Sequence, residues 1–440
     1  MKINIITLGC SKNTVDSENL AGSLTALGHT VHFDRQRNDC DAIIVNTCGF
    51  IGDAKEESIN TILQQIAVKT HGRKARILIA CGCLVERYKE ELKAEMPEVD
   101  AWYGVHEWEK IVSDLKLNNQ AIQQSSNPTT IRRLSTPSHY AYLKIAEGCN
   151  RSCSYCAIPL IRGAHKSIPI DELIAEAKAL VAKGVKELIV ISQDTTWYGL
   201  DLYRRRALGE LLNRLAEESG AEWIRLHYTY PASFPDDAID AIASHPNICN
   251  YIDIPLQHIN SRILKSMQRG IDREGTLRLL DRFRHKLPDA AIRTTLIVGY
   301  PGETEADFQE LKEFVRQARF DRMGCFAYSP EEGTPAEHLG DPIPDEEKQR
   351  RVSELMSIQE EISLEKNQAR VGKVFRCIVD RIEDEYIVAR TEYDSPEVDD
   401  EVLISTKTIK QSSNQAITPG DFINVRITSA MENDLIGELA

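Results

Sequence analysis

Short apolar runs alternate with helical stretches along most of this chain, and this order restricts its possible folds more than any other feature. Three runs within residues 1–120 have the length and composition of buried strands: Ile3–Leu8, Asp41–Asn46 and Ala75–Ala80. Helical stretches, Ser17–Leu27 and Ala54–Lys69, separate them. This order predicts a parallel α/β sheet with helices on its faces.

The same alternation resumes over residues 139–367. Six runs there are predicted strands: Tyr140–Ile145, Glu187–Ser192, Trp223–Tyr228, Tyr251–Pro255, Ala291–Val298 and Arg322–Ala327. Helical segments such as Ile170–Ala182 and Glu305–Ala318 lie between them. Six strand–helix repeats favour a partial (β/α)6 barrel over a closed eight-stranded one. A doubly wound open sheet is the structural alternative.

The remaining segments differ in composition. Residues 121–138 are predicted to be a linker, because the stretch Asn118–Ser138 is rich in Gln, Asn, Ser, Thr and Pro without any period. In residues 370–440 four short strands are predicted between turn residues: Lys373–Asp380, Tyr386–Arg390, Glu401–Ser405 and Asp421–Ile427. That segment therefore indicates a small all-β barrel. The chain of 440 residues is predicted to form three domains, 1–120, 139–367 and 370–440.

Composition excludes several classes of function. The chain carries 53 Lys and Arg against 67 Asp and Glu, a net charge of −14, so as a whole it is a poor non-specific binder of nucleic acid or anionic membrane. No apolar run approaches the roughly 20 residues of a membrane span, and the N-terminus lacks the layout of a secretion signal. We therefore expect a cytoplasmic protein, where disulfides are rare. The eleven cysteines then require metal binding, catalysis or packing as their explanation.

Three of these cysteines lie close together in sequence. Cys149, Cys153 and Cys156 have the spacing C-x3-C-x2-C on a loop just after a predicted strand. A structural zinc site usually takes four ligands, commonly from two separated pairs. Three thiolates on one loop instead fit a 4Fe–4S cluster with one iron left open. The alternative is three unrelated or buried thiols.

A second set of cysteines is scattered along the first domain. Cys10, Cys48 and Cys83 each follow a predicted strand. Because the carboxyl ends of parallel strands share one edge of a sheet, the three should converge there and form a second three-thiolate site. Cys81 competes with Cys83 for the third position, and a strand would place both on the same face. We favour Cys83, which lies at the strand's end; buried packing is the alternative for any of them.

The three-cysteine loop resembles the signature of the radical S-adenosylmethionine superfamily, C-x3-C-x-aromatic-C, with Tyr155 as the aromatic residue. The resemblance implies that Cys149, Cys153 and Cys156 ligate a 4Fe–4S cluster whose open iron chelates the amine and carboxylate of S-adenosylmethionine. It implies that one electron cleaves this cofactor into methionine and a 5′-deoxyadenosyl radical. Tyr155 would pack by its main chain near the adenine.

Nearly the whole chain resembles the methylthiotransferase family. The matching segments are 7–13 (TLGCSKN), 46–51 (NTCGFI), 82–88 (GCLVERY), 142–145 (YLKI) and 158–163 (IPLIRG), and the C-terminal barrel is similar to the TRAM module. The resemblance implies that sulfur is inserted into an unactivated C–H bond and then methylated by a second S-adenosylmethionine. Cys10, Cys48 and Cys83 would hold an auxiliary 4Fe–4S cluster that presents the sulfur. A flavodoxin or ferredoxin-type electron donor is also implied.

Two branches of this family differ in substrate: one modifies an adenosine in tRNA, the other a ribosomal protein. Residues 370–440 hold eight basic and fourteen acidic side chains, a net charge of −6, with acid concentrated in Asp394–Glu401. An acidic barrel would repel tRNA and suit a basic protein of the small ribosomal subunit, so no tight tRNA binding is expected. The alternative is that this run is simply a solvated loop.

Motifs in the central domain agree with the charge argument. Four segments resemble the RimO branch: 192–199 (SQDTTWYG), 226–231 (LHYTYP), 251–258 (YIDIPLQH) and 322–329 (RMGCFAYS). That branch methylthiolates the β-carbon of an aspartate in protein twelve of the small subunit. Segment 332–336 (EGTPA) is closer to the general family form, so a tRNA adenosine methylthiotransferase is kept as the alternative.

Four further residues are candidates for binding S-adenosylmethionine. Gln193 and Asp194 end the second predicted barrel strand, at the functional edge of such barrels. Val298 and Gly299 lie where a strand enters a Gly-Pro-Gly turn, a region that lines the cofactor in the superfamily. The alternatives are a helix N-cap for Asp194 and turn geometry for Gly299.

Overall fold

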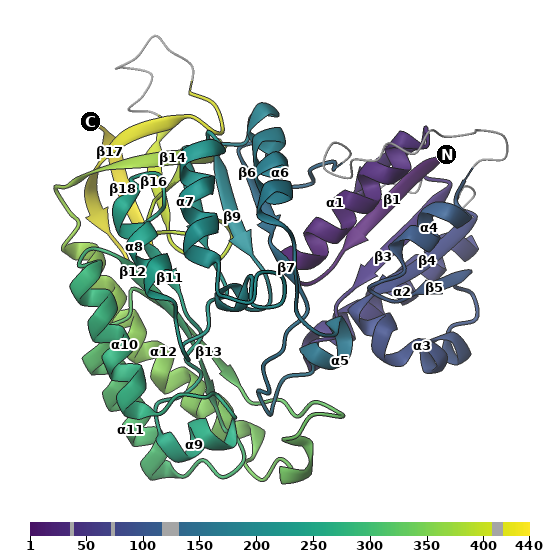
Figure 1. The fold of residues 1–440 in the computed structure, drawn as a ribbon. Helices are drawn as coiled ribbons and strands as arrows, with labels where there is room; N and C mark the ends of the chain where they lie inside the picture. Colours follow the sequence, from purple (N-terminus) through teal and green to yellow (C-terminus); the bar gives the residue numbers. More distant parts are fainter. Residues whose placement is uncertain (36–38, 72–74, 117–131, 407–416) are drawn as a thin grey trace.

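The computed structural model describes residues 1–35, 39–71, 75–116, 132–406 and 417–440 (Figure 1). Three bodies of secondary structure follow one another along the chain: a parallel sheet, a larger series of strands and helices, and a small β-barrel. Most of the predicted linker lies outside the described residues, and residues 132–138 carry no helix or strand. Among the described helices, none combines the length and the apolar character needed to cross a membrane.

The first body is a five-stranded parallel sheet in the order β2-β1-β3-β4-β5. Its strands are β1 (Lys2–Thr7), β2 (Thr30–Phe33), β3 (Ala42–Thr47), β4 (Ile77–Gly82) and β5 (Ala101–Tyr103). Its helices are α1 (Ser11–Ala26) and α4 (Trp108–Asp114) on one face, and α2 (Gly52–His71) and α3 (Cys83–Glu95) on the other. All six residues of β3 are buried, as a strand covered on both faces requires. The predicted parallel sheet is confirmed.

The central body contains the six predicted strands, all parallel to their neighbours. One sheet has the order β10-β9-β6 and the other β11-β12-β13. Their bounds are β6 (Tyr140–Lys144), β9 (Glu187–Ile191), β10 (Trp223–Leu226), β11 (Tyr251–Asp253), β12 (Ala291–Val298) and β13 (Arg322–Ala327). A single parallel bridge, Ile224 to Ile248, lies between the two sheets. The result is the open, partial barrel that the sequence predicts.

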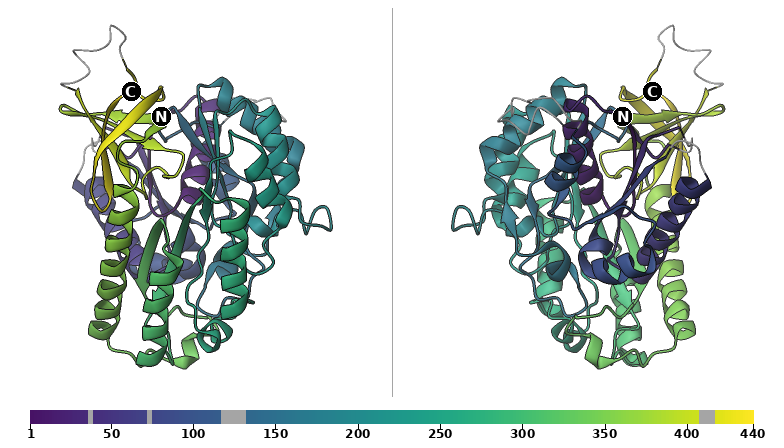
Figure 2. Two further views of the ribbon diagram at one scale, coloured as in Figure 1. Left: turned by 90° about the vertical axis from the view of Figure 1, so that its left-hand side faces the viewer. Right: turned by 90° about the vertical axis from the view of Figure 1, so that its right-hand side faces the viewer.

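Helices cover the outside of this barrel (Figures 1 and 2). They are α6 (Ile170–Ala182), α7 (Leu208–Glu218), α8 (Asp236–Ser244), α10 (Arg273–Lys286), α11 (Glu305–Ala318) and α12 (Asp345–Gln368). The shorter helices α5 (Ile158–Arg162) and α9 (Ser261–Ser266) pack in other clusters, and short 3-10 turns occur at η2 (Thr195–Trp197) and η3 (Glu337–Leu339). Alternate strand residues such as Ala141 and Leu143 pack under the helices. Their neighbours Tyr140 and Tyr142 lie in a separate cluster on the opposite face.

A short antiparallel pair, β7 (Ala146–Glu147) and β8 (Lys166–Ser167), leaves the end of β6. The loop with three cysteines and helix α5 lie between these two strands in sequence. Figure 1 shows α5 next to α3 of the first body, and the two helices are in contact. This contact brings the two cysteine regions toward each other.

The C-terminal body is a closed barrel in the order β14-β15-β16-β18-β17, as predicted. Its strands are β14 (Val374–Ile382), β15 (Tyr386–Thr391), β16 (Glu401–Ser405), β17 (Phe422–Ala430) and β18 (Asp434–Leu439), of which β18 was not predicted. Figure 2 shows the barrel, in yellow, at one end of the central domain.

Three carboxylates of the acidic run between β15 and β16 pair with arginines of the central domain. Asp394 is fully buried and lies 2.5 Å from the Arg322 guanidinium, which also contacts Asp400 at 3.0 Å. Asp399 contacts Arg293 at 3.2 Å. These carboxylates therefore join the barrel to β12 and β13 and face neither a substrate nor solvent. Glu397 of the same run is exposed, so only part of the acidic charge is neutralised inside the molecule, and the expectation that the barrel disfavours tRNA stays a prediction.

Candidate functional site

The loop with Cys149, Cys153 and Cys156 is closed at its base by a glycine. Gly148 has a φ of +74°, and a Cβ there would lie 2.2 Å from the carbonyl oxygen of Ala164. The Cys149 amide donates to the Gly163 carbonyl at 3.1 Å. These contacts fold the segment back on itself, so that its cysteines lie on one short turn.

The three thiols of this first triplet share one buried site. Burial raises the pKa of Cys149 to about 11, and the negative charges of Asp194 and Cys153 act in the same direction. Burial also raises the pKa of Cys156 to about 12, with Cys153 and Cys149 adding to the effect. Each thiol therefore lies within electrostatic reach of the others. A cation or metal is needed to hold them as thiolates.

Arg269 supplies one such cation. Its Nη1 donates to the Cys153 sulfur at 3.3 Å and to the Tyr155 hydroxyl at 3.2 Å. The Tyr230 hydroxyl lies 3.7 Å from the same sulfur. Arg269 Nε is buried and has no hydrogen-bond partner within the described part of the chain. The sequence analysis missed this residue, since nothing in its local pattern connects it to a loop over a hundred positions earlier.

The second triplet is assembled from three strand ends. Cys10, Cys48 and Cys83 follow β1, β3 and β4, which are neighbours in the sheet. Burial raises the pKa of Cys83 to about 12; Arg162 opposes this shift, while Cys10 and Cys48 add to it. Gly9 has a φ of +87°, and a Cβ there would lie 2.8 Å from the Cys48 sulfur. The structure therefore brings together the three cysteines that the sequence analysis placed at this edge.

Cys81 and Cys83 do not share a face as expected. Gly82 between them has a φ of +99°, which ends β4 and turns the chain into α3. Cys81 packs in the hydrophobic cluster between the sheet and helices α1 and α4. Cys83 packs instead against Ala157 and Ile161 of the central domain. The glycine thus separates a core cysteine from a site cysteine two positions away.

One arginine connects the two cysteine regions across the domain interface. Arg162, at the end of α5, donates through Nη2 to the Cys83 sulfur at 3.3 Å and to Asn13 Oδ1 at 2.5 Å. Its Nη1 contacts Asp16 at 2.7 Å and Glu147 at 3.1 Å. Glu147 is two residues before Cys149. The sequence analysis quoted this arginine only as part of a motif, and the IPLIRG segment was the available signal.

The predicted cofactor-binding residues have mixed surroundings. Gln193 donates to Glu147 at 2.7 Å, and its buried Oε1 has no partner among the described residues. Asp194 caps η2 by accepting from the Thr196 amide at 2.9 Å, and it also pairs with Arg151 at 2.6 Å. The N-cap alternative for Asp194 is therefore what the structure shows. Gln193 retains a free acceptor for a ligand.

Val298 and Gly299 have structural roles. The Val298 side chain packs in the core beneath the helices of the barrel. Gly299 has a φ of +76°, and a Cβ there would lie 2.4 Å from Cγ of Lys348 on α12. Its amide donates to Glu303 at 2.7 Å. Turn geometry and close packing thus account for Gly299, and any cofactor contact at these two positions would have to use the main chain.

Both triplets fit iron–sulfur chemistry better than zinc. Over the described ranges, no three His, Cys, Asp or Glu side chains are gathered into a group that would hold a single metal ion. In a 4Fe–4S cluster each thiolate binds a different iron, so its cysteines stand further apart than the ligands of one zinc ion. The donor set of each triplet is thiol only, which is the set that such clusters take.

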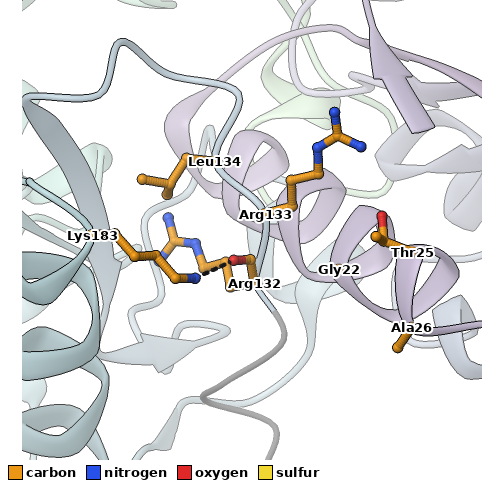
Figure 3. Close-up of a pocket in the computed structure, with 7 residues that line it drawn as sticks. All are labelled: Gly22, Thr25, Ala26, Arg132, Arg133, Leu134 and Lys183. Carbon is orange, nitrogen blue, oxygen red and sulfur yellow. Dashed lines mark hydrogen bonds between the residues drawn. The ribbon is translucent and has the colours of Figure 1, made fainter. Parts of the chain in front are cut away.

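A surface pocket lies away from both triplets (Figure 3). Its lining consists of Gly22, Thr25, Ala26, Arg132, Arg133, Leu134 and Lys183. Arg132 is already paired with the buried carboxylate of Glu18 at 2.6 Å, and Lys183 donates to the Arg132 carbonyl at 2.7 Å. The pocket contains none of the predicted site residues, and its polar groups hold α1 against the central domain.

Three family models match the chain in the order of its three bodies. The Uncharacterized protein family UPF0004 matches residues 2–104, the Radical SAM superfamily residues 143–315 and the TRAM domain residues 371–440. The fold and the cysteine sites therefore define a radical S-adenosylmethionine enzyme with an additional N-terminal domain and a TRAM barrel.

Curated relatives match the chain from end to end. A protein of Flavobacterium johnsoniae is 52% identical over 440 residues, covering 100% of this chain and 98% of the relative. One of Parabacteroides distasonis is 50% identical over 440 residues, covering 100% and 99%. Both are named ribosomal protein uS12 methylthiotransferase RimO, and the chain belongs to this family. Its cofactors are S-adenosylmethionine and two 4Fe–4S clusters, as predicted.

Solved structures share the fold at low sequence identity. The radical S-adenosylmethionine methyltransferase TsrM from Kitasatospora setae has a TM-score of 0.56 and 13% identity, covering 81% of this chain and 90% of that chain. The cobalamin-dependent radical enzyme OxsB has a TM-score of 0.51 and 11% identity, covering 82% and 56%. These likenesses support the architecture only.

Proposed function

We propose that this protein methylthiolates the β-carbon of an aspartate in the ribosomal protein uS12. Its full-length likeness to the RimO family supports this substrate over a tRNA adenosine. The observation that carries the mechanism is the pairing of two thiol triplets across one domain interface, with Arg162 contacting Cys83 on one side and Glu147 on the other. A reaction that generates a radical at one site and delivers sulfur at another requires such a juxtaposition.

We assign Cys149, Cys153 and Cys156 to the cluster that binds S-adenosylmethionine. Cys10, Cys48 and Cys83 are assigned to the auxiliary cluster. When bound, the first cluster and S-adenosylmethionine supply the radical that removes a substrate hydrogen, and the auxiliary cluster supplies sulfur. Cys48, Cys83 and Cys153 are buried, Cys149 and Cys156 are half-buried, and Cys10 is exposed, so each set of thiols can be reached from outside by a ligand or substrate.

The protein's own groups orient these sites. Gln193 offers a free carbonyl oxygen beside the first triplet and so fits a hydrogen-bond donor such as the amine or ribose of S-adenosylmethionine. Arg269 places a positive charge beside the Cys153 sulfur, at 3.3 Å. Tyr155 is held by its hydroxyl on Arg269, leaving its main chain for the adenine.

Partners follow from the chemistry. The low-potential electron is assigned to a flavodoxin or ferredoxin-type donor. The net charge of −14 disfavours tight tRNA binding, independently of the buried acidic run. Thiol ligands and a ribosomal substrate both suit the cytoplasm.

The test is mass spectrometry of uS12 and of tRNA from a strain lacking this protein, with and without complementation. We expect uS12 to gain one methylthio group on complementation by the wild-type chain and not by Cys153→Ala. Modification of tRNA adenosine without modification of uS12 would overturn the proposed substrate.

A further inference from the structure

Lys12 is a largely buried lysine whose ammonium group has no counter-ion among the described residues. It lies in the first turn of α1, two residues after Cys10, and is only 6% exposed. Within the described part of the chain, its Nζ has no carboxylate at ion-pair distance and no hydrogen bond. Its contact there is the ring of Tyr228, whose centroid lies 2.8 Å from Nζ.

Lys348, a second buried lysine among the described residues, shows what the Lys12 position lacks. Lys348 is 2% exposed, and its Nζ contacts two carboxylates, Asp341 at 2.5 Å and Asp345 at 3.0 Å. Burying a charge is costly unless it is paired, because its hydration is lost without replacement. An aromatic face offsets only part of that cost. Lys12 can therefore bind an anion, which the described part of the chain does not supply.

The ring beneath Lys12 is rigidly held. Tyr228 has a φ of +57°, a left-handed conformation that is uncommon for a residue with a large side chain. Its amide donates to Asp253 at 2.8 Å, and its carbonyl accepts from the Thr195 amide at 3.1 Å. Its hydroxyl lies 3.4 Å from the Ser11 hydroxyl. Strain of this kind persists where surrounding contacts fix a residue, and it concentrates at functional sites.

Lys12 and Tyr228 are each followed closely in sequence by a residue that lies near one of the triplets. On the central-domain side, Tyr228 is followed two positions later by Tyr230, whose hydroxyl is 3.7 Å from the Cys153 sulfur. On the other side, the residue after Lys12 is Asn13, whose Oδ1 is 3.7 Å from the Cys83 sulfur. An anion held by Lys12 would therefore sit at the interface between the domain of the second triplet and the domain of the first, against Tyr228.

We propose that Lys12 binds the side-chain carboxylate of the substrate aspartate and so selects that residue; this rests on the proposed function. The β-carbon of aspartate is bonded directly to its carboxyl carbon, so the reacting carbon lies only two bonds from the carboxylate oxygen that Lys12 would hold. The methionyl carboxylate of S-adenosylmethionine has the same chemistry, and the experiment below distinguishes the two sources. Asparagine, being uncharged, would lose the ion pair.

The test measures binding of two synthetic uS12 peptides to the reconstituted holoenzyme under anaerobic conditions. One peptide carries the target aspartate and the other has asparagine in its place. For Lys12→Gln we expect the Kd of the aspartate peptide to rise about tenfold or more, as for a lost hydrogen bond to a charged group. The Kd of the asparagine peptide should hardly change. Lys12→Arg should recover part of the affinity.

The matched control is Lys178→Gln, which removes an exposed lysine paired with Glu218 and should change neither Kd. The thermal unfolding temperature of Lys12→Gln should not fall, because no ion pair is broken. Equal weakening of both peptides together with a lower unfolding temperature would indicate a structural lysine and overturn the proposal. Weaker S-adenosylmethionine binding with unchanged peptide binding would assign Lys12 to the cofactor and also overturn it. A wild-type enzyme that modifies no uS12 at all would instead contradict the proposed function.

Discussion

The two cysteine triplets each bring three thiols together, but by different routes. The first comes from one turn, Cys149 to Cys156, held by contacts within the same short segment. The second comes from three strand ends, Cys10, Cys48 and Cys83, and exists only because β1, β3 and β4 are adjacent and parallel. The position of the first three thiols thus depends mainly on the conformation of one loop, and that of the second three on the order of strands in the sheet. Damage to the sheet should remove the second without the first.

The largest effect is expected at the local triplet. Cys153→Ala should reduce cleavage of S-adenosylmethionine to background and with it every later step, because one cluster ligand is lost. The measurement is 5′-deoxyadenosine formed by the reconstituted enzyme. The control is Cys249→Ala, a buried cysteine in a separate hydrophobic cluster, which should retain cleavage. Normal cleavage by Cys153→Ala would refute the assignment of this triplet.

At the second triplet the two activities should separate. Cys48→Ala and Cys83→Ala should still form 5′-deoxyadenosine but should not methylthiolate uS12, because sulfur delivery is lost. Cys81→Ala is the matched control, since that thiol packs in the core two residues from Cys83. If Cys81→Ala lost methylthiolation and Cys83→Ala kept it, our choice between them would be wrong.

Substitutions of the glycines beside the triplets test whether the two sites are independent of each other. Gly148→Ala and Gly9→Ala each force a side chain into a left-handed backbone, at a cost of about 1–2 kcal/mol before any overlap is counted. The overlap at Gly148 is with the Ala164 carbonyl and at Gly9 with the Cys48 sulfur. We expect Gly148→Ala to lower cofactor cleavage and Gly9→Ala to lower methylthiolation only. Identical losses in both variants would mean that the two sites are not independent.

The smallest effect is expected for the residue that joins the triplets. Arg162→Met removes the donor to Cys83 and leaves Asp16 and Glu147 with fewer partners. Methylthiolation should fall by about tenfold or more, the usual cost of losing an outer partner of a metal ligand. The reduction potential of the auxiliary cluster should shift as well. Arg162→Lys should retain part of the methylthiolation activity and shift the reduction potential less. An unchanged reduction potential in Arg162→Met would show that the contact between Arg162 and Cys83 does not affect the auxiliary cluster.

Much of the fold could be predicted because strand and helix patterns are local. The six barrel strands match the predicted runs closely, since each is an apolar segment bounded by turns. The short strands β2 and β5 were missed, having only four and three residues. Helix α1 begins at Ser11, earlier than predicted, because its first turn carries polar residues that face the domain interface rather than an apolar core.

The site shows a similar division. The six cysteines proposed as cluster ligands could be selected from spacing and strand position, which are features of the sequence, and the structure brings each set of three together. Arg162, Arg269 and Lys12 could not, because their roles depend on contacts between segments distant in sequence. The partners of the acidic run could not be predicted for the same reason: Arg293 and Arg322, which pair with Asp399 and Asp394, lie in another domain.

The most direct test of the account is the iron and sulfide content of anaerobically reconstituted protein. We predict about eight iron atoms per wild-type chain, in two clusters of four, and about four in each of Cys153→Ala and Cys48→Ala. About four irons in the wild-type chain, or bound zinc in place of iron and sulfide, would contradict the claim that the two triplets hold separate clusters.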